Sequence, residues 1–332
     1  MELIKLTNSS GASVTLSPLG AGIVSIVVPD KEGKLENVAL SYASPEDYMN
    51  DGPCLGKIPG RYANRIGKGK LTVEDKEYQL AVNCGPHHLH GGPTGFQNRI
   101  WDAEKFPGGV RFTYHSADGE ENYPGNVKVV AEYRWSDDNV LTLDLTATTD
   151  APTVINLTNH LYVNLDGADS GNALSQLLTL KSDRFLVTDD SLCPTGELAS
   201  VDGTPMDFTT EKPVGRDIHS DFKPLLVGKG YDHCFAIKDW KRGELVEDVA
   251  VLRSERSGRV MAISSTQPAL QLYTGNWLKG SPKNASGGFY EDYDGIAIEC
   301  QGYPDAPNHP EFPSQLLLPG EPYRETIRFS FR

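Results

Sequence analysis

Short runs in which apolar and polar residues alternate recur along the whole chain. This period of two is typical of half-buried β-strands. The clearest example is a hairpin over Asn126–Trp135 and Val140–Thr148, joined by turn residues at 136–139. Further strands are predicted at Ser13–Leu16, Ile23–Val28, Gln176–Leu180, Val249–Leu252, Val260–Ser264, Ala269–Tyr273, Ile296–Cys300 and Thr326–Phe331.

Helical periodicity is weak, and no run of more than about ten residues follows it. Ser44 followed by Pro45 predicts one short helical turn. Asp183–Gly230 is rich in Pro, Asp and Gly and is expected to be a long irregular excursion within one domain. Many strands and few helices indicate an all-β fold, a single large antiparallel β-sandwich over residues 1–332.

The segment Thr153–Leu165 differs from the other predicted strands in its polar side. One face carries Ile155, Leu157, Asn159, Leu161, Val163 and Leu165, and the other Val154, Asn156, Thr158, His160, Tyr162 and Asn164. The second face offers amides, hydroxyls and one imidazole, with no Lys or Glu. It is interpreted either as the wall of a cleft for an uncharged, hydroxyl-rich ligand or as an ordinary polar sheet face.

Composition narrows the class of partner. The 332 residues carry a net charge of −14, which disfavours binding to nucleic acid or to an anionic membrane. No secretory signal and no long apolar span is visible in the sequence. The five cysteines are scattered without a Cys-x-x-Cys pair, so we expect free thiols in a reducing compartment, the cytoplasm.

Glu299 is the strongest candidate for chemistry. It follows Ile296-Ala297-Ile298 at the end of a predicted strand, so its carboxyl group is expected to be partly desolvated. Desolvation raises the pKa of a carboxyl group and suits it to proton transfer near neutral pH. The alternative is a structural glutamate paired with an arginine at a sheet edge.

Three histidines, His87, His88 and His90, precede the pair Gly91-Gly92. A metal site is disfavoured because no further ligands have suitable spacing, and hydrogen bonding to sugar hydroxyls is preferred for His90. His87 and His88 are interpreted as loop residues, and His115, His219, His233 and His309 as structural. No phosphate-binding glycine loop or Gly-x-Ser-x-Gly motif is present, and no metal or other cofactor is expected.

The sequence resembles the aldose 1-epimerases, also called galactose mutarotases, over nearly its whole length. The resemblance rests on six motifs in the family's order: GRYANRI (Gly60–Ile66), HLHGGPTGF (His88–Phe96) followed by Trp101, NLTNHLYVNL (Asn156–Leu165), YDHCF (Tyr231–Phe235), LQLYTGNWL (Leu270–Leu278) and IECQGYPDAPNHPEFPS (Ile298–Ser314). It implies a large β-sandwich with an open sugar cleft.

The resemblance also implies roles for residues at matching positions. Glu299 would be the general base and His160 the general acid, facing each other across the sugar ring. The groups that hold the sugar would be Asn64, Arg65, His90, Asp232 and Gln271, with Tyr162 in the binding site and His90 also close to the reacting oxygens. The family often has Ser and Phe where this chain has Leu161 and Val163, which affects only the packing behind His160.

The implied reaction is the interconversion of α and β anomers of a free aldohexose such as galactose or glucose, by a monomer or homodimer. Two alternatives stay open. A hexose 6-phosphate substrate would need a basic cluster, for which Arg61 and Arg65 are the candidates. A non-catalytic sugar-binding module would stack its ligand on aromatic residues such as Tyr162, Tyr273, Trp277 and Phe289.

Overall fold

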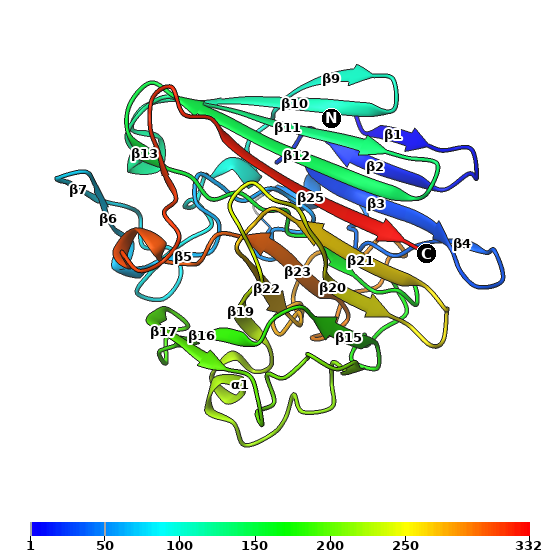
Figure 1. The fold of residues 1–332 in the computed structure, drawn as a ribbon. Coiled ribbons are helices and arrows are strands. Elements are labelled where there is room, and N and C mark those ends of the chain that lie inside the picture. The colour runs from blue at the N-terminus through cyan, green and yellow to red at the C-terminus, as the bar shows by residue number, and fades with distance from the viewer. Residues whose placement is uncertain (1, 50) are drawn as a thin grey trace.

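A computed structural model describes residues 2–49 and 51–332 of the chain. Its largest sheet has nine strands, which run side by side across the molecule (Figure 1). In spatial order these are β18 (Lys212–Pro213), β15 (Leu177–Leu180), β20 (Val246–Arg253), β21 (Val260–Ser265), β25 (Tyr323–Phe331), β12 (Val140–Thr149), β11 (Val127–Trp135), β10 (Gly109–Ser116) and β9 (Asp102–Phe106).

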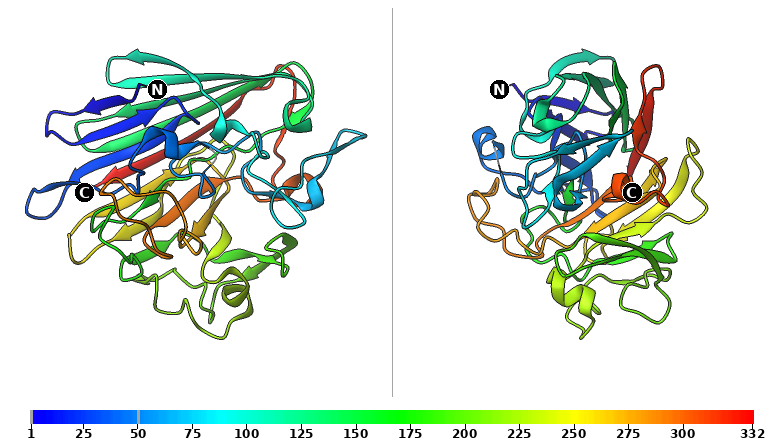
Figure 2. Two further views of the ribbon diagram at one scale, coloured as in Figure 1. Left: turned by 180° about the vertical axis from the view of Figure 1, so that it is seen from behind. Right: turned by 90° about the vertical axis from the view of Figure 1, so that its left-hand side faces the viewer.

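Two smaller sheets pack against this one. The six-stranded sheet consists of β14 (Tyr162–Val163), β23 (Ile296–Gln301), β22 (Ala269–Tyr273), β19 (Asp232–Ala236), β16 (Arg184–Thr188) and β17 (Pro194–Ser200), in that order. The four-stranded sheet consists of β1 (Ile4–Thr7), β2 (Ser13–Ser17), β3 (Gly22–Pro29) and β4 (Leu35–Asn37). One cluster of buried apolar side chains joins all three sheets, so the architecture is the antiparallel β-sandwich that the sequence predicts (Figure 2).

The remaining elements are short. Three two-stranded sheets pair β13 (Thr153–Val154) with β24 (Leu316–Leu317), β5 (Arg65–Ile66) with β8 (His88–Leu89), and β6 (Lys70–Val73) with β7 (Lys76–Gln79). The helical elements are α1 (Lys223–Gly228) and the 3-10 turns η1 (Pro45–Tyr48), η2 (Gly67–Gly69), η3 (Phe96–Asn98), η4 (Glu120–Asn122) and η5 (Ala306–Asn308). Among the described residues, no helix is long and apolar enough to cross a membrane.

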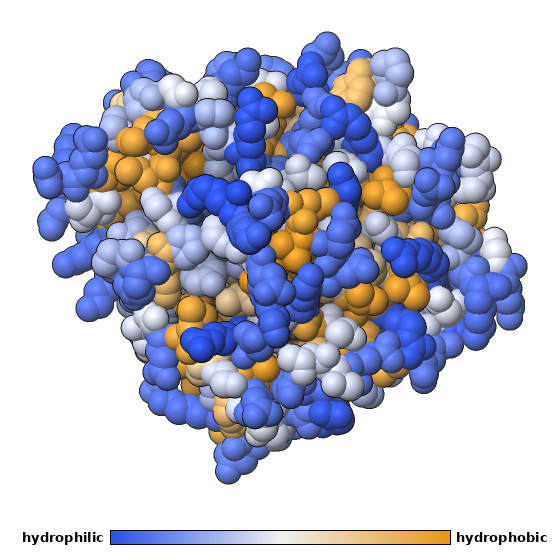
Figure 3. Space-filling model, in the orientation of Figure 1, coloured by the Kyte–Doolittle hydropathy of each residue, from blue (hydrophilic) through white to orange (hydrophobic). Residues whose placement is uncertain are grey.

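The predicted hairpin is confirmed with its alternation intact. β11 pairs with β12 from Trp135 opposite Leu141 to Val127 opposite Thr149. The predicted apolar positions of both arms are buried, and their neighbours reach the outer face of the sheet. On the side of the molecule seen in Figure 3, hydrophilic residues cover most of the surface, as expected for a solvated outer face.

Two predictions about local structure are corrected. Asp183–Gly230 is not wholly irregular, since it contains β16, β17, β18 and α1. Thr153–Leu165 is not a continuous strand, because only β13 and β14 at its two ends are regular. The helical turn expected at Ser44-Pro45 is confirmed as η1.

The main apolar cluster contains residues from Ile4 near one end of the chain to Phe331 near the other. A shared core of this extent supports one domain. The assignment of residues 1–332 to a single domain stays a prediction.

Candidate active site

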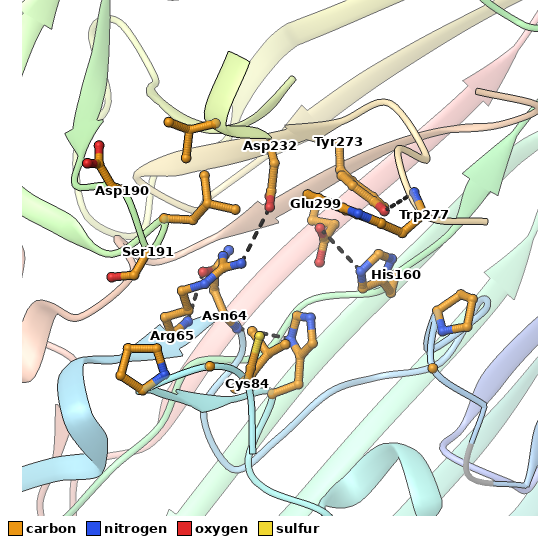
Figure 4. Close-up of a pocket in the computed structure, with 18 of the residues that line it drawn as sticks. Asn64, Arg65, Cys84, His160, Asp190, Ser191, Asp232, Tyr273, Trp277 and Glu299 are labelled. Carbon is orange, nitrogen blue, oxygen red and sulfur yellow. Dashed lines mark hydrogen bonds and ion pairs between the residues drawn. The ribbon is translucent and has the colours of Figure 1, made fainter. Parts of the chain in front are cut away.

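A cavity of about 690 Å³ opens on one face of the six-stranded sheet (Figure 4). Its volume falls within the usual range for small-molecule sites. Seven of the eight residues assigned to the site from sequence line it, namely Asn64, Arg65, His90, His160, Tyr162, Asp232 and Glu299. The eighth, Gln271, does not line the cavity but hydrogen-bonds to Asp232, which does.

Strand register brings four polar or aromatic side chains to this face. Gln271 on β22 lies opposite Glu299 on β23, and Tyr273 lies opposite Asp232 on β19. Directly opposed residues share a face of a sheet, and so do residues two apart on one strand. The alternate residues of these strands, Leu270, Leu272, Ile296 and Ile298, enter the main core. The sandwich therefore fixes the sheet from behind while its front face forms the floor of the cavity.

Two loops complete the opposite wall. Asn64 and His90 both have left-handed backbone conformations, with φ of 64° and 51°, and β5 pairs with β8 between them. The backbone N–H of Asn64 donates to Nδ1 of His90 at 3.1 Å, so the remaining ring proton of neutral His90 is on Nε2. At Gly91 (φ 78°) a Cβ atom would lie 1.8 Å from the carbonyl oxygen of Gly60, so only glycine fits this turn.

His160 lies in the part of Thr153–Leu165 that is not a strand. Its backbone N–H donates to the Lys57 carbonyl, and its own carbonyl accepts from the Gly56 N–H, both at 2.9 Å. Asn159 adds a side-chain hydrogen bond to the Gly56 carbonyl at 2.7 Å. In this segment, hydrogen bonds to loop residues take the place of the hydrogen bonds that a neighbouring strand would make. The predicted alternation still holds in part, since Leu157, Leu161 and Val163 are in the core while His160 and Tyr162 line the cavity.

Glu299 and His160 point toward one another in the cavity (Figure 4). Oε1 of Glu299 lies 3.6 Å from Nε2 of His160, and the two side chains are 2% and 6% exposed. This spacing leaves no room for a sugar ring between them, so the expectation that they face each other across the ring is wrong. Both groups can instead reach neighbouring oxygens of one ligand from the same side.

The second atoms of this pair are buried without a hydrogen-bond partner in the described part of the chain: Oε2 of Glu299 and Nδ1 of His160. Buried polar atoms are usually satisfied, and leaving one unpaired costs about 1–3 kcal/mol. Both residues line the same cavity, so the pair is suited to a polar ligand that could satisfy these atoms.

Burial sets the protonation of the pair. It raises the pKa of Glu299 well above its usual value, an effect that the nearby Asp232 carboxylate reinforces and Arg65 opposes. Burial also lowers the pKa of His160 to about 4, which Asp232 partly offsets. Burial therefore favours the uncharged form of both groups, the carboxylic acid of Glu299 and the neutral imidazole of His160.

Asp232 forms the centre of a second polar group. One of its carboxylate oxygens accepts from Nε2 of Gln271 at 2.6 Å, and the other lies 3.5 Å from a guanidinium nitrogen of Arg65. The side chains of Arg65 and Asp232 are 9% and 12% exposed, so both can also reach a ligand. Gln271 itself is buried and orients Asp232 rather than lining the cavity.

The aromatic candidates divide into three positions. Tyr162 stacks on His160 with ring centroids 4.8 Å apart, and its hydroxyl donates to the Pro53 carbonyl at 3.0 Å. Its phenol thus supports the imidazole. Tyr273 and Trp277 stack on each other at the edge of the cavity, where Trp277 is 43% exposed. Phe289 is exposed and does not line the cavity.

His87, His88 and Arg61 have structural partners. His88 contacts the Ala81 carbonyl and the Tyr123 hydroxyl, and His87 contacts the Ser191 hydroxyl at 2.6 Å. Arg61 is buried against the carbonyls of residues 117, 124 and 125 and does not line the cavity. Over residues 2–49 and 51–332, no group of three or more His, Cys, Asp or Glu side chains is placed to hold a metal ion. The expectation of no metal or other cofactor stays a prediction.

Sequence reasoning missed part of the cavity wall. Cys84, Asp190, Ser191, Leu192 and Val227 line it but belong to no motif noticed in the sequence. Most of them lie within the excursion at 183–230, whose folding onto the cavity depends on the strands β16 and β17 that were not expected. The hydrogen bond from His87 to Ser191 is the contact that joins this excursion to the histidine loop.

Comparison with known proteins places these features in context. A family model described as aldose 1-epimerase matches residues 2–330. A galactose mutarotase of Mus musculus is 40% identical over 97% of this chain and 92% of its own length. An aldose 1-epimerase of Escherichia coli (strain K12) is 36% identical over 99% of this chain and 95% of its own length.

Solved structures give the same picture. The crystal structure of an aldose epimerase homologue from C. elegans has a TM-score of 0.91 and 32% identity, covering 100% of this chain and 98% of the other. That of a galactose 1-epimerase from Lactobacillus acidophilus NCFM has a TM-score of 0.85 and 30% identity, covering 99% of this chain and 94% of the other.

Proposed function

The chain belongs to the aldose 1-epimerase family, and from this premise we propose that Glu299 and His160 carry out the isomerisation in the cavity described above. The protein is an isomerase that interconverts the α and β anomers of a free aldohexose. The observation that carries the site assignment is the 3.6 Å contact between a buried carboxyl group and a buried imidazole, each with one unpaired polar atom.

Ring opening requires a proton to leave the C1 hydroxyl and another to reach the ring oxygen. Glu299 as carboxylate takes the first, and His160 as imidazolium supplies the second. The bond between C1 and the ring oxygen then breaks, and its electron pair stays on the ring oxygen that His160 protonates. The C1 oxygen becomes the carbonyl of an open-chain aldehyde, and rotation about C1–C2 presents its other face. Reclosure returns both protons in the reverse direction. General acid–base catalysis of this kind typically contributes about 10²–10⁴-fold.

Burial favours Glu299 as the acid beside neutral His160. That state carries the same total charge as carboxylate beside imidazolium. Transfer of one proton from Oε1 to Nε2 generates the working form without exchange with solvent. The pair titrates as a unit, so the mechanism depends on holding one shared acidic proton rather than on either pKa alone.

The rest of the cavity suits a neutral polyol. Asn64, Arg65 and Asp232 supply both donors and acceptors, and His90 presents an N–H from Nε2. The charges of Arg65 and Asp232 offset each other at 3.5 Å. A hexose 6-phosphate would bring a dianion, and Arg61, the second arginine of the basic cluster considered for it, is used elsewhere in the structure. Free aldohexoses are therefore the preferred substrates.

Polarimetry with freshly dissolved α-D-galactose and α-D-glucose tests the proposal. We expect the protein to accelerate the approach to anomeric equilibrium well beyond the spontaneous rate for at least one of them. Glucose 6-phosphate should be a poorer substrate. Binding of galactose without acceleration would instead favour the non-catalytic sugar-binding module.

A cytoplasmic location and a monomeric or homodimeric state are also proposed. All five cysteines are free, which supports a reducing compartment. Size-exclusion chromatography with light scattering would test the oligomeric state.

A further inference from the structure

Lys57 is a lysine almost completely enclosed by protein, with its side chain 1% exposed. Its ammonium group forms an ion pair with Asp51, whose side chain is fully buried. It also donates to the Tyr48 carbonyl at 2.6 Å and lies 3.4 Å from the side-chain oxygen of Asn98. Burying two charges carries a desolvation cost of several kcal/mol per ion, which the contacts around them must offset. A pair of this kind calls for an explanation beyond general stability.

The segment between the two charges is folded around them. Asp51 accepts from the Leu55 N–H at 2.8 Å and from the Tyr42 hydroxyl at 3.3 Å. Cys54 within it has a left-handed conformation, with φ of 57°. The ion pair therefore closes the loop 51–57 into one rigid shape.

This loop is the principal support of His160. Gly56 and Lys57 hold both backbone groups of His160 at 2.9 Å, and the Gly56 carbonyl accepts from the Asn159 side chain. The Pro53 carbonyl accepts from the hydroxyl of Tyr162, the residue that stacks on the imidazole. A shift of the loop would therefore move the ring of His160 relative to Glu299.

Lys57 also contributes charge. The charged and titratable groups around His160 are Glu299 on β23, Asp232 on β19, His90 and Lys57 on loops, and the phenols of Tyr162 and Tyr273. Of these, Lys57 is the group whose field opposes protonation of His160, while Asp232 favours it.

We infer that Lys57, through its buried ion pair with Asp51, is a positioning residue that holds His160 against Glu299. The inference rests on the proposed function, because it assigns Lys57 a part in the same reaction. Lys57 does not touch the substrate and acts only through His160.

The test is Lys57→Met, which keeps the length of the side chain and removes its charge. We expect kcat to fall about tenfold, because small displacements of a catalytic group are costly, with KM changed by less than about twofold. Removing the positive charge should also move the acid limb of the kcat–pH profile to higher pH. A purely structural role would lower the folded fraction but leave that limb unchanged.

Lys212→Met is the matched control. Lys212 is also 1% exposed, also pairs with an aspartate, Asp217, at 2.7 Å, and also donates to a carbonyl, that of Pro205. It does not line the cavity. We expect its variant to lose stability with wild-type kcat and an unchanged acid limb.

If Lys57→Met does not fold, the double variant Asp51→Asn/Lys57→Met leaves no unpaired buried charge. It should also lower kcat, with a smaller shift of the acid limb because a negative charge is lost as well. Either variant with wild-type kcat and acid limb would overturn the inference while leaving the proposed function intact. A wild-type protein without mutarotase activity would overturn both.

Discussion

Replacing Glu299 by glutamine separates its catalytic role from its structural one. Glutamine has the shape of the protonated carboxyl group that burial favours at this position, but it cannot accept a proton from the C1 hydroxyl. Loss of one general acid–base group costs about 10²–10⁴-fold in kcat. This corresponds to about 3–5 kcal/mol of transition-state free energy. We therefore expect Glu299→Gln to fold normally and to retain at most about one hundredth of the wild-type kcat.

The stability of the variant has a predicted pH dependence. A glutamate whose pKa is raised by folding contributes stability below its unfolded pKa, about 4.3, and loses it as pH rises through the folded value. Glutamine has no such loss. Glu299→Gln should therefore gain stability relative to wild type as pH rises above about 4.3, as measured by urea unfolding at several pH values.

Glu325→Gln provides the control. Burial also raises the pKa of Glu325, to about 7, and its carboxylate accepts a hydrogen bond from Thr266, but it lies away from the cavity. Its variant should shift the pH dependence of stability in the same direction and leave kcat unchanged. Polarimetry with fresh α-D-galactose, corrected for spontaneous mutarotation, measures the rates. A Glu299→Gln enzyme within a few-fold of wild type would refute the assignment of the base.

Three further predictions concern binding, backbone shape and a buried imidazole. Asp232→Asn should raise KM for galactose about tenfold or more, because a hydrogen bond to a charged group contributes ~1.5–3 kcal/mol. An unchanged KM would count against sugar binding by Asp232. Gly91→Ala should lower the free energy of unfolding in urea by clearly more than Gly243→Ala does. Both residues have φ near 79°, but only at Gly91 would a Cβ atom meet backbone atoms. Equal losses of unfolding free energy would contradict this steric argument. Burial lowers the pKa of His233 to about 4, so its contribution to stability is present above about pH 6.5 and is lost as pH falls toward 4. The deficit in unfolding free energy of His233→Gln should therefore narrow by about 2 kcal/mol between pH 7.5 and pH 5, and a constant deficit would exclude this linkage.

The regular strands could be predicted from sequence because alternating apolar and polar residues are typical of a sheet with one buried face. The hairpin at 126–149 and β22 match their predicted ranges closely. Thr153–Leu165 has the same alternation but is mostly not a strand. Its backbone partners are loop groups at positions 56, 57, 61 and 315, far away in the sequence, and no local pattern announces them.

The sequence predicted which residues belong to the site but not how their side chains are arranged. The apolar run before Glu299 predicted burial and a raised pKa, and the structure agrees with both. The close contact between Glu299 and His160 depends on how the loop 51–57 carries the His160 segment against β23, which residue types alone do not encode. Gln271 lies opposite Glu299 on the same face and hydrogen-bonds to Asp232, and its contact with the sugar stays a prediction.

The position of β25 has a consequence for how the molecule is made. Residues 323–331 are the last strand in the sequence, yet they lie between β12 and β21 near the middle of the nine-stranded sheet. Until they are synthesised, the sheet is two separate halves, each with an open edge able to pair with another nascent chain. The sandwich therefore closes only after residues 323–331 have been synthesised, and removal of these few residues should send the polypeptide toward aggregation rather than toward a smaller working enzyme.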